Sequence, residues 1–83
     1  METIYNRIKL FRIEKGISRQ ELADLVQVNP QTIGFLEREQ YNPSLSLALK
    51  IAKVFGVSVH NVFSITEFPS LLTTKENHKE PTR

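Results

Sequence analysis

The sequence predicts a small all-α domain of five short helices, and three observations lead to this expectation. Apolar residues recur at the three- and four-residue spacing of helices through most of the chain. Residues that favour helix starts, Ser18, Asn29 and Ser44, stand directly before three of these segments. Gly16 and Gly56 follow two of them, at the position where a left-handed residue commonly ends a helix.

Composition narrows the class of protein further. The 83 residues are enough for one small domain, and 11 basic against 9 acidic residues give a net charge of +2. This mild excess means that any case for nucleic-acid binding depends on where the charges lie. The chain has no cysteine, which excludes disulfides, thiolate zinc sites and a cysteine nucleophile.

The chain also lacks the sequence features of membrane proteins and of enzymes. No apolar run approaches the roughly 20 residues of a membrane span, and the N-terminus does not resemble a signal peptide, so we expect a soluble cytoplasmic protein. Neither His60 nor His78 has a neighbouring acid–nucleophile arrangement. There is no glycine-rich phosphate loop or cluster of metal ligands. We therefore expect no catalysis, no cofactor and no metal.

The first predicted helix covers residues 7–15. Asn6 is the expected N-cap. Ile8, Phe11 and Leu10 are expected to form its apolar stripe, opposite the charged side chains of the same segment.

The second predicted helix begins after Ser18. Glu21 follows three residues later, which is the spacing of a capping box, in which each side chain accepts a hydrogen bond from the other residue's backbone N–H. The side expected to be buried, where Ala23 would allow close approach of another helix, consists of Leu22, Ala23, Leu25 and Val26.

The third predicted helix starts at Pro30 and follows a sharp turn near Gln27. Asn29 is its expected N-cap, and proline is well suited to the first helical position because its missing N–H has no partner there. Helical spacing directs Ile33 and Leu36 toward the core. The opposite side carries Gln31, Phe35 and Arg38, with Gly34 between them.

The fourth predicted helix runs from Ser44, its N-cap, to Gly56. Its expected apolar positions are Leu45, Ala48, Leu49, Ile51, Ala52 and Phe55. A last short helix, residues 59–63, starts after Ser58 and is expected to contribute Val62 and Phe63 to the core.

Two segments at the ends of this helical region are typical of β-strands. Ile4 and Tyr5 are β-prone, and residues 64–68 alternate in polarity until Pro69 would end a strand. We expect these segments to pair as a short two-stranded sheet. The domain would then cover residues 1–68, and residues 69–83 would form a polar, flexible tail.

Several segments together resemble the Cro/repressor-type (Xre) helix-turn-helix family of transcriptional regulators. The matching segments are residues 6–12 (NRIKLFR), 15–23 (KGISRQELA), 31–33 (QTI), 36–38 (LER) and 41–57 (YNPSLSLALKIAKVFGV). The resemblance implies a compact five-helix, lambda-repressor-like DNA-binding domain. It also implies that a dimer binds operator DNA, with the third helix in the major groove and half-sites about 34 Å apart.

The resemblance further implies which residues contact double-stranded DNA. Gln31 is the expected base reader, because its side-chain amide can bond adenine through two hydrogen bonds. Thr32 would touch a thymine methyl or a phosphate, and Arg38 and Asn42 would contact phosphates. Residues near the start of the second helix would also reach the backbone. The full DNA-facing set is Arg19, Gln20, Pro30, Gln31, Thr32, Phe35, Arg38 and Asn42. The alternative is that these are ordinary solvated side chains.

The sequence departs from the family pattern on the outer face of the third helix. Pro30, Gly34 and Phe35 stand where polar residues are frequent, so this face offers fewer hydrogen bonds and more apolar contact. Phe35 would pack on a thymine methyl, cover the edge of the core, or meet a protein partner. Gln27 and Glu39 occupy positions where glycine is common, so Gln27 is expected to adopt a positive φ, with some strain.

Arg12 and Glu37 match a pair that often forms a partly buried ion pair in this family. We therefore expect a structural role for both, tying the first helix to the third, and no role in reading DNA. Loss of one partner would leave the other poorly compensated, typically at a cost of several kcal/mol.

The leading functional hypothesis is a homodimeric repressor that binds a palindromic operator. The dimer interface would use apolar residues beyond the fourth helix, because so small a domain has few places to bury them. These residues are Val59, Val62, Phe63, Ile65 and Phe68, with Leu71 and Leu72 as further candidates. The alternative is that they close the monomer core. Two other functions stay open: an antitoxin or similar protein-binding module with a protein partner on its C-terminal tail, and a restriction–modification controller.

Overall fold

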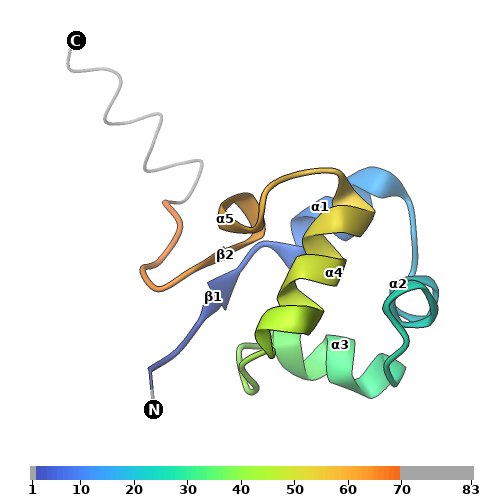
Figure 1. Ribbon diagram of the computed structural model, residues 1–83, viewed down its shortest axis with the longest axis horizontal. Helices are drawn as coiled ribbons and strands as arrows, with labels where there is room; N and C mark the ends of the chain where they lie inside the picture. Colours follow the sequence, from blue (N-terminus) through green and yellow to red (C-terminus); the bar gives the residue numbers. More distant parts are fainter. Residues whose placement is uncertain (1, 70–83) are drawn as a thin grey trace, which may run out of the picture.

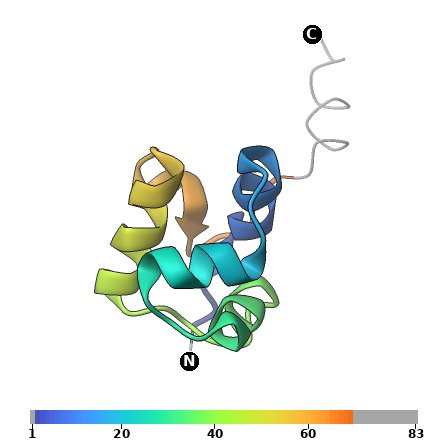
Figure 2. The same cartoon turned by 90° about the vertical axis from the view of Figure 1, so that its right-hand side faces the viewer.

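The computed structural model describes residues 2–69, which form five α-helices and one two-stranded antiparallel sheet (Figure 1). In chain order the elements are β1 (Tyr5–Asn6), α1 (Ile8–Lys15), α2 (Arg19–Val26), α3 (Pro30–Glu37), α4 (Leu45–Phe55), α5 (Val59–Val62) and β2 (Phe63–Ser64). In Figure 2, α2 lies across the molecule, with α1 and α4 standing on either side of it. The predicted five-helix architecture is confirmed.

The predicted starts of the three central helices are also confirmed. Ser18 and Glu21 form the capping box of α2: Glu21 N–H donates to Ser18 Oγ over 3.0 Å, and Ser18 N–H donates to Glu21 Oε1 over 2.8 Å. The side-chain oxygen of Asn29 caps α3, with Pro30 at the first helical position, and that of Ser44 caps α4. These local hydrogen bonds fix where each helix begins.

The start of α1 differs by one residue from the prediction, because Asn6 belongs to β1 and Arg7 takes the N-cap position. Asn6 still supports the helix start, since its Oδ1 accepts a hydrogen bond from the N–H of Ile8 over 3.1 Å. Its Nδ2 donates to the carbonyl of Leu36 over 2.7 Å and so ties the N-terminal strand to the end of α3.

The hydrophobic core lies between α1, α2, α3, α4 and α5. Its buried residues are Ile8, Leu22, Ala23, Val26, Ile33, Leu36, Leu47, Ala48, Ile51, Ala52, Val62 and Phe63. The predicted burial of Leu10, Leu25, Leu45 and Leu49 is wrong, since all four are about half exposed or more. In α4 the buried stripe passes through Leu47 and Ile51, which puts Leu45 and Leu49 on a flank that no described element covers.

The predicted pairing of the two β-prone ends is confirmed, with strands shorter than expected. Tyr5 lies opposite Ser64, and Asn6 lies opposite Phe63, in antiparallel register. Phe63 belongs to β2 and not to α5, and β2 ends at Ser64, whose Oγ accepts a hydrogen bond from the N–H of Thr66 in a tight turn.

The turn between α2 and α3 contains the positive φ expected at Gln27. Its backbone angles are φ 64° and ψ 47°, and its N–H donates to the carbonyls of Ala23 and Asp24. Glu39, just after α3, also has a positive φ of 61°. Both positions favour glycine, because a Cβ crowds the backbone in this conformation.

Replacing Gln27 by glycine should therefore stabilise the protein. We expect Gln27→Gly to raise the free energy of unfolding by about 0.5–1 kcal/mol, because glycine removes the crowding in the left-handed conformation. Thermal unfolding followed by circular dichroism should show a midpoint about 2–8 °C higher. Gln27→Ala, which keeps a Cβ, is the matched control and should bring no gain. An unchanged or lower midpoint for Gln27→Gly would contradict the presence of strain.

Candidate nucleic-acid interface

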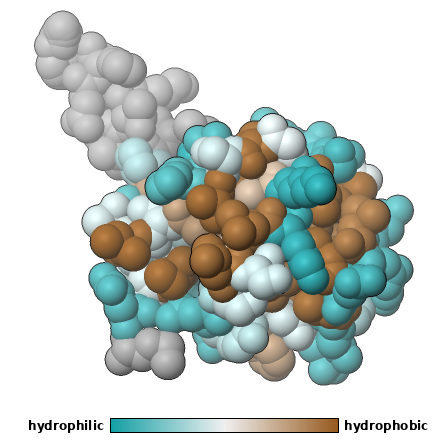
Figure 3. Space-filling view, in the orientation of Figure 1, coloured by the Kyte–Doolittle hydropathy of each residue, from teal (hydrophilic) through white to brown (hydrophobic). Residues whose placement is uncertain are grey.

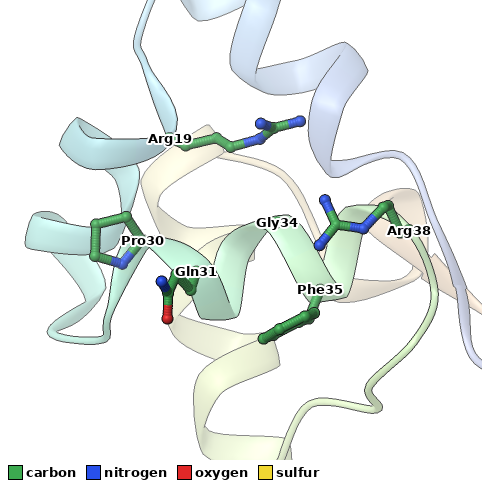
Figure 4. A pocket seen from close by; sticks show the side chains of 6 residues that line it. All are labelled: Arg19, Pro30, Gln31, Gly34, Phe35 and Arg38. Atoms are coloured by element: carbon green, nitrogen blue, oxygen red, sulfur yellow. The ribbon is translucent and has the colours of Figure 1, made fainter.

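The outer face of α3 and one side chain of α2 surround a surface hollow of about 490 Å³ (Figure 4). It is lined by Arg19, Pro30, Gln31, Gly34, Phe35 and Arg38. Gln31 and Phe35 project from the same side of α3, as their four-residue spacing requires, and the Arg38 side chain folds back toward Gly34 (Figure 4). Arg19 and Arg38 thus lie on two sides of the hollow, and none of the residues that line it is acidic.

Gln31 is the polar group most available for a ligand on this face. Its backbone N–H is bonded to Asn29 Oδ1, which caps the helix, and the residue is exposed. Within residues 2–69 its side-chain amide has no hydrogen-bond partner. A carboxamide of this kind offers one donor and one acceptor in a fixed plane, which is the pattern that adenine presents in the major groove.

Phe35 and Arg38 form a contacting pair on the same face. The guanidinium carbon of Arg38 lies 5.4 Å from the centre of the Phe35 ring, within the range of a cation–π interaction. Phe35 is 45% exposed and is not part of the core or packed against it. Phe35 therefore lies outside the buried core, which Ile33 and Leu36 reach from the other side of α3.

The Arg38 guanidinium lies over Gly34. A Cβ built at Gly34 would lie 3.4 Å from Nη1 of Arg38, which is van der Waals contact with the end of a flexible side chain. The guanidinium thus lies back along the helix, next to Phe35, while its Nε donates to Gln40 Oε1 over 3.3 Å.

Glu37 accepts hydrogen bonds from two arginines. Arg12 Nε lies 2.8 Å from Glu37 Oε2, the ion pair that the resemblance implied, and Arg12 also donates from Nη1 to the carbonyl of Ile17. Arg19 Nε lies 2.9 Å from Glu37 Oε1, a second ion pair that the sequence did not predict. The Glu37 side chain is only 3% exposed, whereas that of Arg19 is 46% exposed. Glu37 therefore links α1, α2 and α3 and holds the Arg19 side chain at the edge of the hollow.

The remaining residues of the predicted DNA-facing set lie in different settings. Gln20 is exposed on α2, with its amide bonded to Asp24, and Thr32 is half-buried on α3. Asn42 is bonded to the N-terminal segment: its Oδ1 accepts from the N–H of Ile4, and its Nδ2 donates to the carbonyl of Glu2. These two hydrogen bonds anchor that segment and leave the second Nδ2–H as the remaining donor of the amide.

The predicted dimer residues also separate into two groups. Val62 and Phe63 are buried in the monomer core, where α5 and β2 pack on the other helices, which agrees with the alternative that they close that core. Val59 packs against the same core, and Phe68 is half-buried, with the Arg7 guanidinium 4.2 Å from its ring centre. The predictions for Leu71, Leu72 and most of the tail lie outside the described residues.

Ile65 is the member of that set that stays open to solvent, with 64% of its surface exposed. It lines a second hollow of about 410 Å³ with Ile4, His60, Phe63 and Ser64. Figure 3 shows apolar side chains gathered over the middle of this face, around β2 and α5.

The described residues form neither a metal site nor a membrane-spanning helix. No three histidine, aspartate or glutamate side chains in residues 2–69 come together as a metal site. Among the same residues, every helix is too short or too polar to cross a bilayer.

Comparison with known proteins bears out the class suggested by this fold and face. A family model described as helix-turn-helix matches residues 8–60. An uncharacterised HTH-type transcriptional regulator of Archaeoglobus fulgidus is 48% identical over 61 residues, which are 74% of this chain and 86% of that protein.

Solved structures give the same result. The N-terminal DNA binding domain of SinR from Bacillus subtilis is 42% identical, with a TM-score of 0.61, over 65% of this chain and 80% of that one. The restriction-modification controller protein C.AhdI from Aeromonas hydrophila is 31% identical, with a TM-score of 0.62, over 65% and 82%.

The fold and its exposed third helix define a helix-turn-helix DNA-binding domain. The chain belongs to the Cro/repressor-type (Xre) family of HTH transcriptional regulators, as its sequence motifs indicated. It is thus a non-enzymatic DNA-binding regulator.

Proposed function

We propose that this protein is a sequence-specific repressor that binds a palindromic operator as a homodimer and blocks a promoter by occupying it. The observation that carries the proposal is the outer face of α3, where the amide of Gln31 has no hydrogen-bond partner among residues 2–69 and lies in a hollow lined by two arginines and by no acidic residue. No bond is made or broken; the effect is steric exclusion. A regulator of this kind works where the DNA is, so the proposal includes a cytoplasmic location.

In this proposal the residues that line the hollow have different roles in DNA recognition. Gln31 reads an adenine through its N6 and N7 atoms. Arg38 and Arg19 contact phosphates on either side of the groove, which fixes the register of the helix without carrying sequence information. Gln20, exposed in the first turn of α2, adds a backbone contact supported by the positive end of the helix dipole.

The phosphate role of Arg38 has a direct test. Arg38→Ala should weaken binding to all duplexes alike and should reduce the slope of log K against log salt by about one unit per bound protomer, because one fewer phosphate is neutralised. Fluorescence anisotropy titrations at several salt concentrations give both quantities. Lys53→Ala, which removes an exposed cation near the C-terminal end of α4, should leave the slope unchanged. An unaltered slope for Arg38→Ala would exclude its contact with phosphate.

The homodimer is supported by the second hollow and the apolar face around it. Ile65 and Ile4 contribute apolar surface, and within residues 2–69 β2 pairs only with β1. A two-fold axis beside this edge would bury Ile65 of both copies against each other, as a self-complementary interface requires. Two α3 helices about 34 Å apart would then reach successive major grooves.

Introducing a charge at Ile65 should therefore separate the subunits. Ile65→Asp should shift the protein from dimer to monomer in sedimentation velocity, because a carboxylate buried in a symmetric interface faces its own copy. The residue is exposed in the monomer, so the variant should keep its helical circular dichroism spectrum. Leu10→Asp, at a position on α1 that is 49% exposed, is the control and should stay dimeric. A persistent Ile65→Asp dimer would move the interface to another surface.

A further inference from the structure

We infer that Phe35, with the Arg38 side chain packed against its ring, recognises the 5-methyl group of a pyrimidine, thymine or 5-methylcytosine, next to the adenine read by Gln31, while Arg38 itself contacts a phosphate. This inference rests on the proposed function, in which α3 lies in the major groove. It assigns a chemical class of ligand to the apolar part of the hollow, where the side chains offer no hydrogen bond.

The first argument is the position and exposure of the ring. Phe35 lies one helical turn after Gln31 and projects from the same side of α3 (Figure 4). It is 45% exposed, and the core on the opposite side of α3 is complete without it. Two side chains one turn apart on a helix in the groove lie over neighbouring base pairs.

The second argument is chemical. Pro30, Gly34 and Phe35 add apolar surface to the hollow and no side-chain hydrogen-bond donor or acceptor. The major-groove edges of the bases carry polar atoms, with the 5-methyl group of a pyrimidine as their one apolar feature. A ring at this position therefore gains by covering a methyl group and loses by covering an unpaired polar atom.

The third argument is how the pair is held. The Arg38 guanidinium lies over Gly34, with its central carbon 5.4 Å from the centre of the Phe35 ring. The Nη1 and Nη2 groups stay available to a phosphate, while the contact with the cation limits the freedom of the ring. Arg38 lies against the ring, Arg19 lines the same hollow, and no acidic side chain lines it, so the surroundings suit a nucleic acid.

The test uses the full chain and a duplex that the chain itself selects from a random library. Each thymine of that duplex is replaced singly by deoxyuridine, which removes the methyl group and changes nothing else on the base edge. We expect one position per half-site at which the dissociation constant rises about four-fold, the factor that corresponds to exposing one methyl-sized group. At that position 5-methylcytosine should bind more tightly than cytosine by a similar factor.

Variants assign the effect to the ring. In Phe35→Ala the deoxyuridine and thymine duplexes should bind equally, whereas Leu10→Ala, a similarly exposed apolar side chain on α1, should keep the difference. The inference is overturned if deoxyuridine is neutral at every position, or if its penalty is unchanged in Phe35→Ala. Failure to select any preferred sequence would instead overturn the proposed function, and the inference with it.

Discussion

Glu37→Ala should lower the free energy of unfolding by about 3–5 kcal/mol. We expect a larger loss of stability from this substitution than from the others proposed for this protein. The carboxylate is 3% exposed and accepts from Arg12, whose side chain is itself only 13% exposed. Without Glu37 the Arg12 guanidinium would stay partly buried with the carbonyl of Ile17 as its remaining described partner. Urea unfolding followed by circular dichroism measures the loss.

Arg19→Ala is the matched control for this prediction, because it removes the other arginine from the same carboxylate. Arg19 is 46% exposed, and ion pairs of such groups contribute less than about 1 kcal/mol. The two variants should thus differ several-fold in their effect on stability, although both remove a hydrogen bond to Glu37. A Glu37→Ala variant whose free energy of unfolding is within about 1 kcal/mol of the wild-type value would contradict the role of this buried charge network in joining α1 to α3.

The sequence predicted those parts of the fold that depend on neighbouring residues. Ser18 with Glu21, and Asn29 with Pro30, determine helix starts through hydrogen bonds and backbone angles within a few residues, so local patterns suffice. The side of α4 that would be buried could not be predicted in the same way. Leu45, Leu47 and Leu49 are chemically alike, and only the positions of the other helices decide which of them is covered.

Some features of the candidate site could likewise be predicted from the sequence, and others could not. The exposed position of Gln31 on α3 followed from helical spacing, because its phase is fixed once Ile33 and Leu36 face the core. The pairing of Arg19 with Glu37 depends on how α2 crosses α3, and the anchoring role of Asn42 depends on the path of the N-terminal segment. Neither geometry leaves a trace in a single sequence.

Gln31→Ala should cost the protein most of its discrimination at one base pair in each half-site. A carboxamide that bonds adenine N6 and N7 together is worth about 1–3 kcal/mol against another base, or roughly 5- to 150-fold per half-site. A dimer makes this contact twice, so the loss on a palindromic operator should be larger than at one half-site. Binding to unrelated DNA depends on phosphate contacts and should stay nearly unchanged. The measured quantity is the ratio of the two dissociation constants at fixed salt.

Two comparisons separate base reading by Gln31 from a general effect on affinity. Gln20→Ala removes a carboxamide from the proposed backbone contacts on α2, so it should weaken the operator and unrelated DNA by the same factor and leave the ratio unchanged. Replacing the adenine by 7-deazaadenine removes the N7 acceptor from the DNA. This change should weaken the wild type and leave Gln31→Ala unaffected, because a contact already lost on one side cannot be lost again on the other. A Gln31→Ala variant that keeps the full ratio would assign base reading to other side chains of α3, with Thr32 and Phe35 the nearest on that helix.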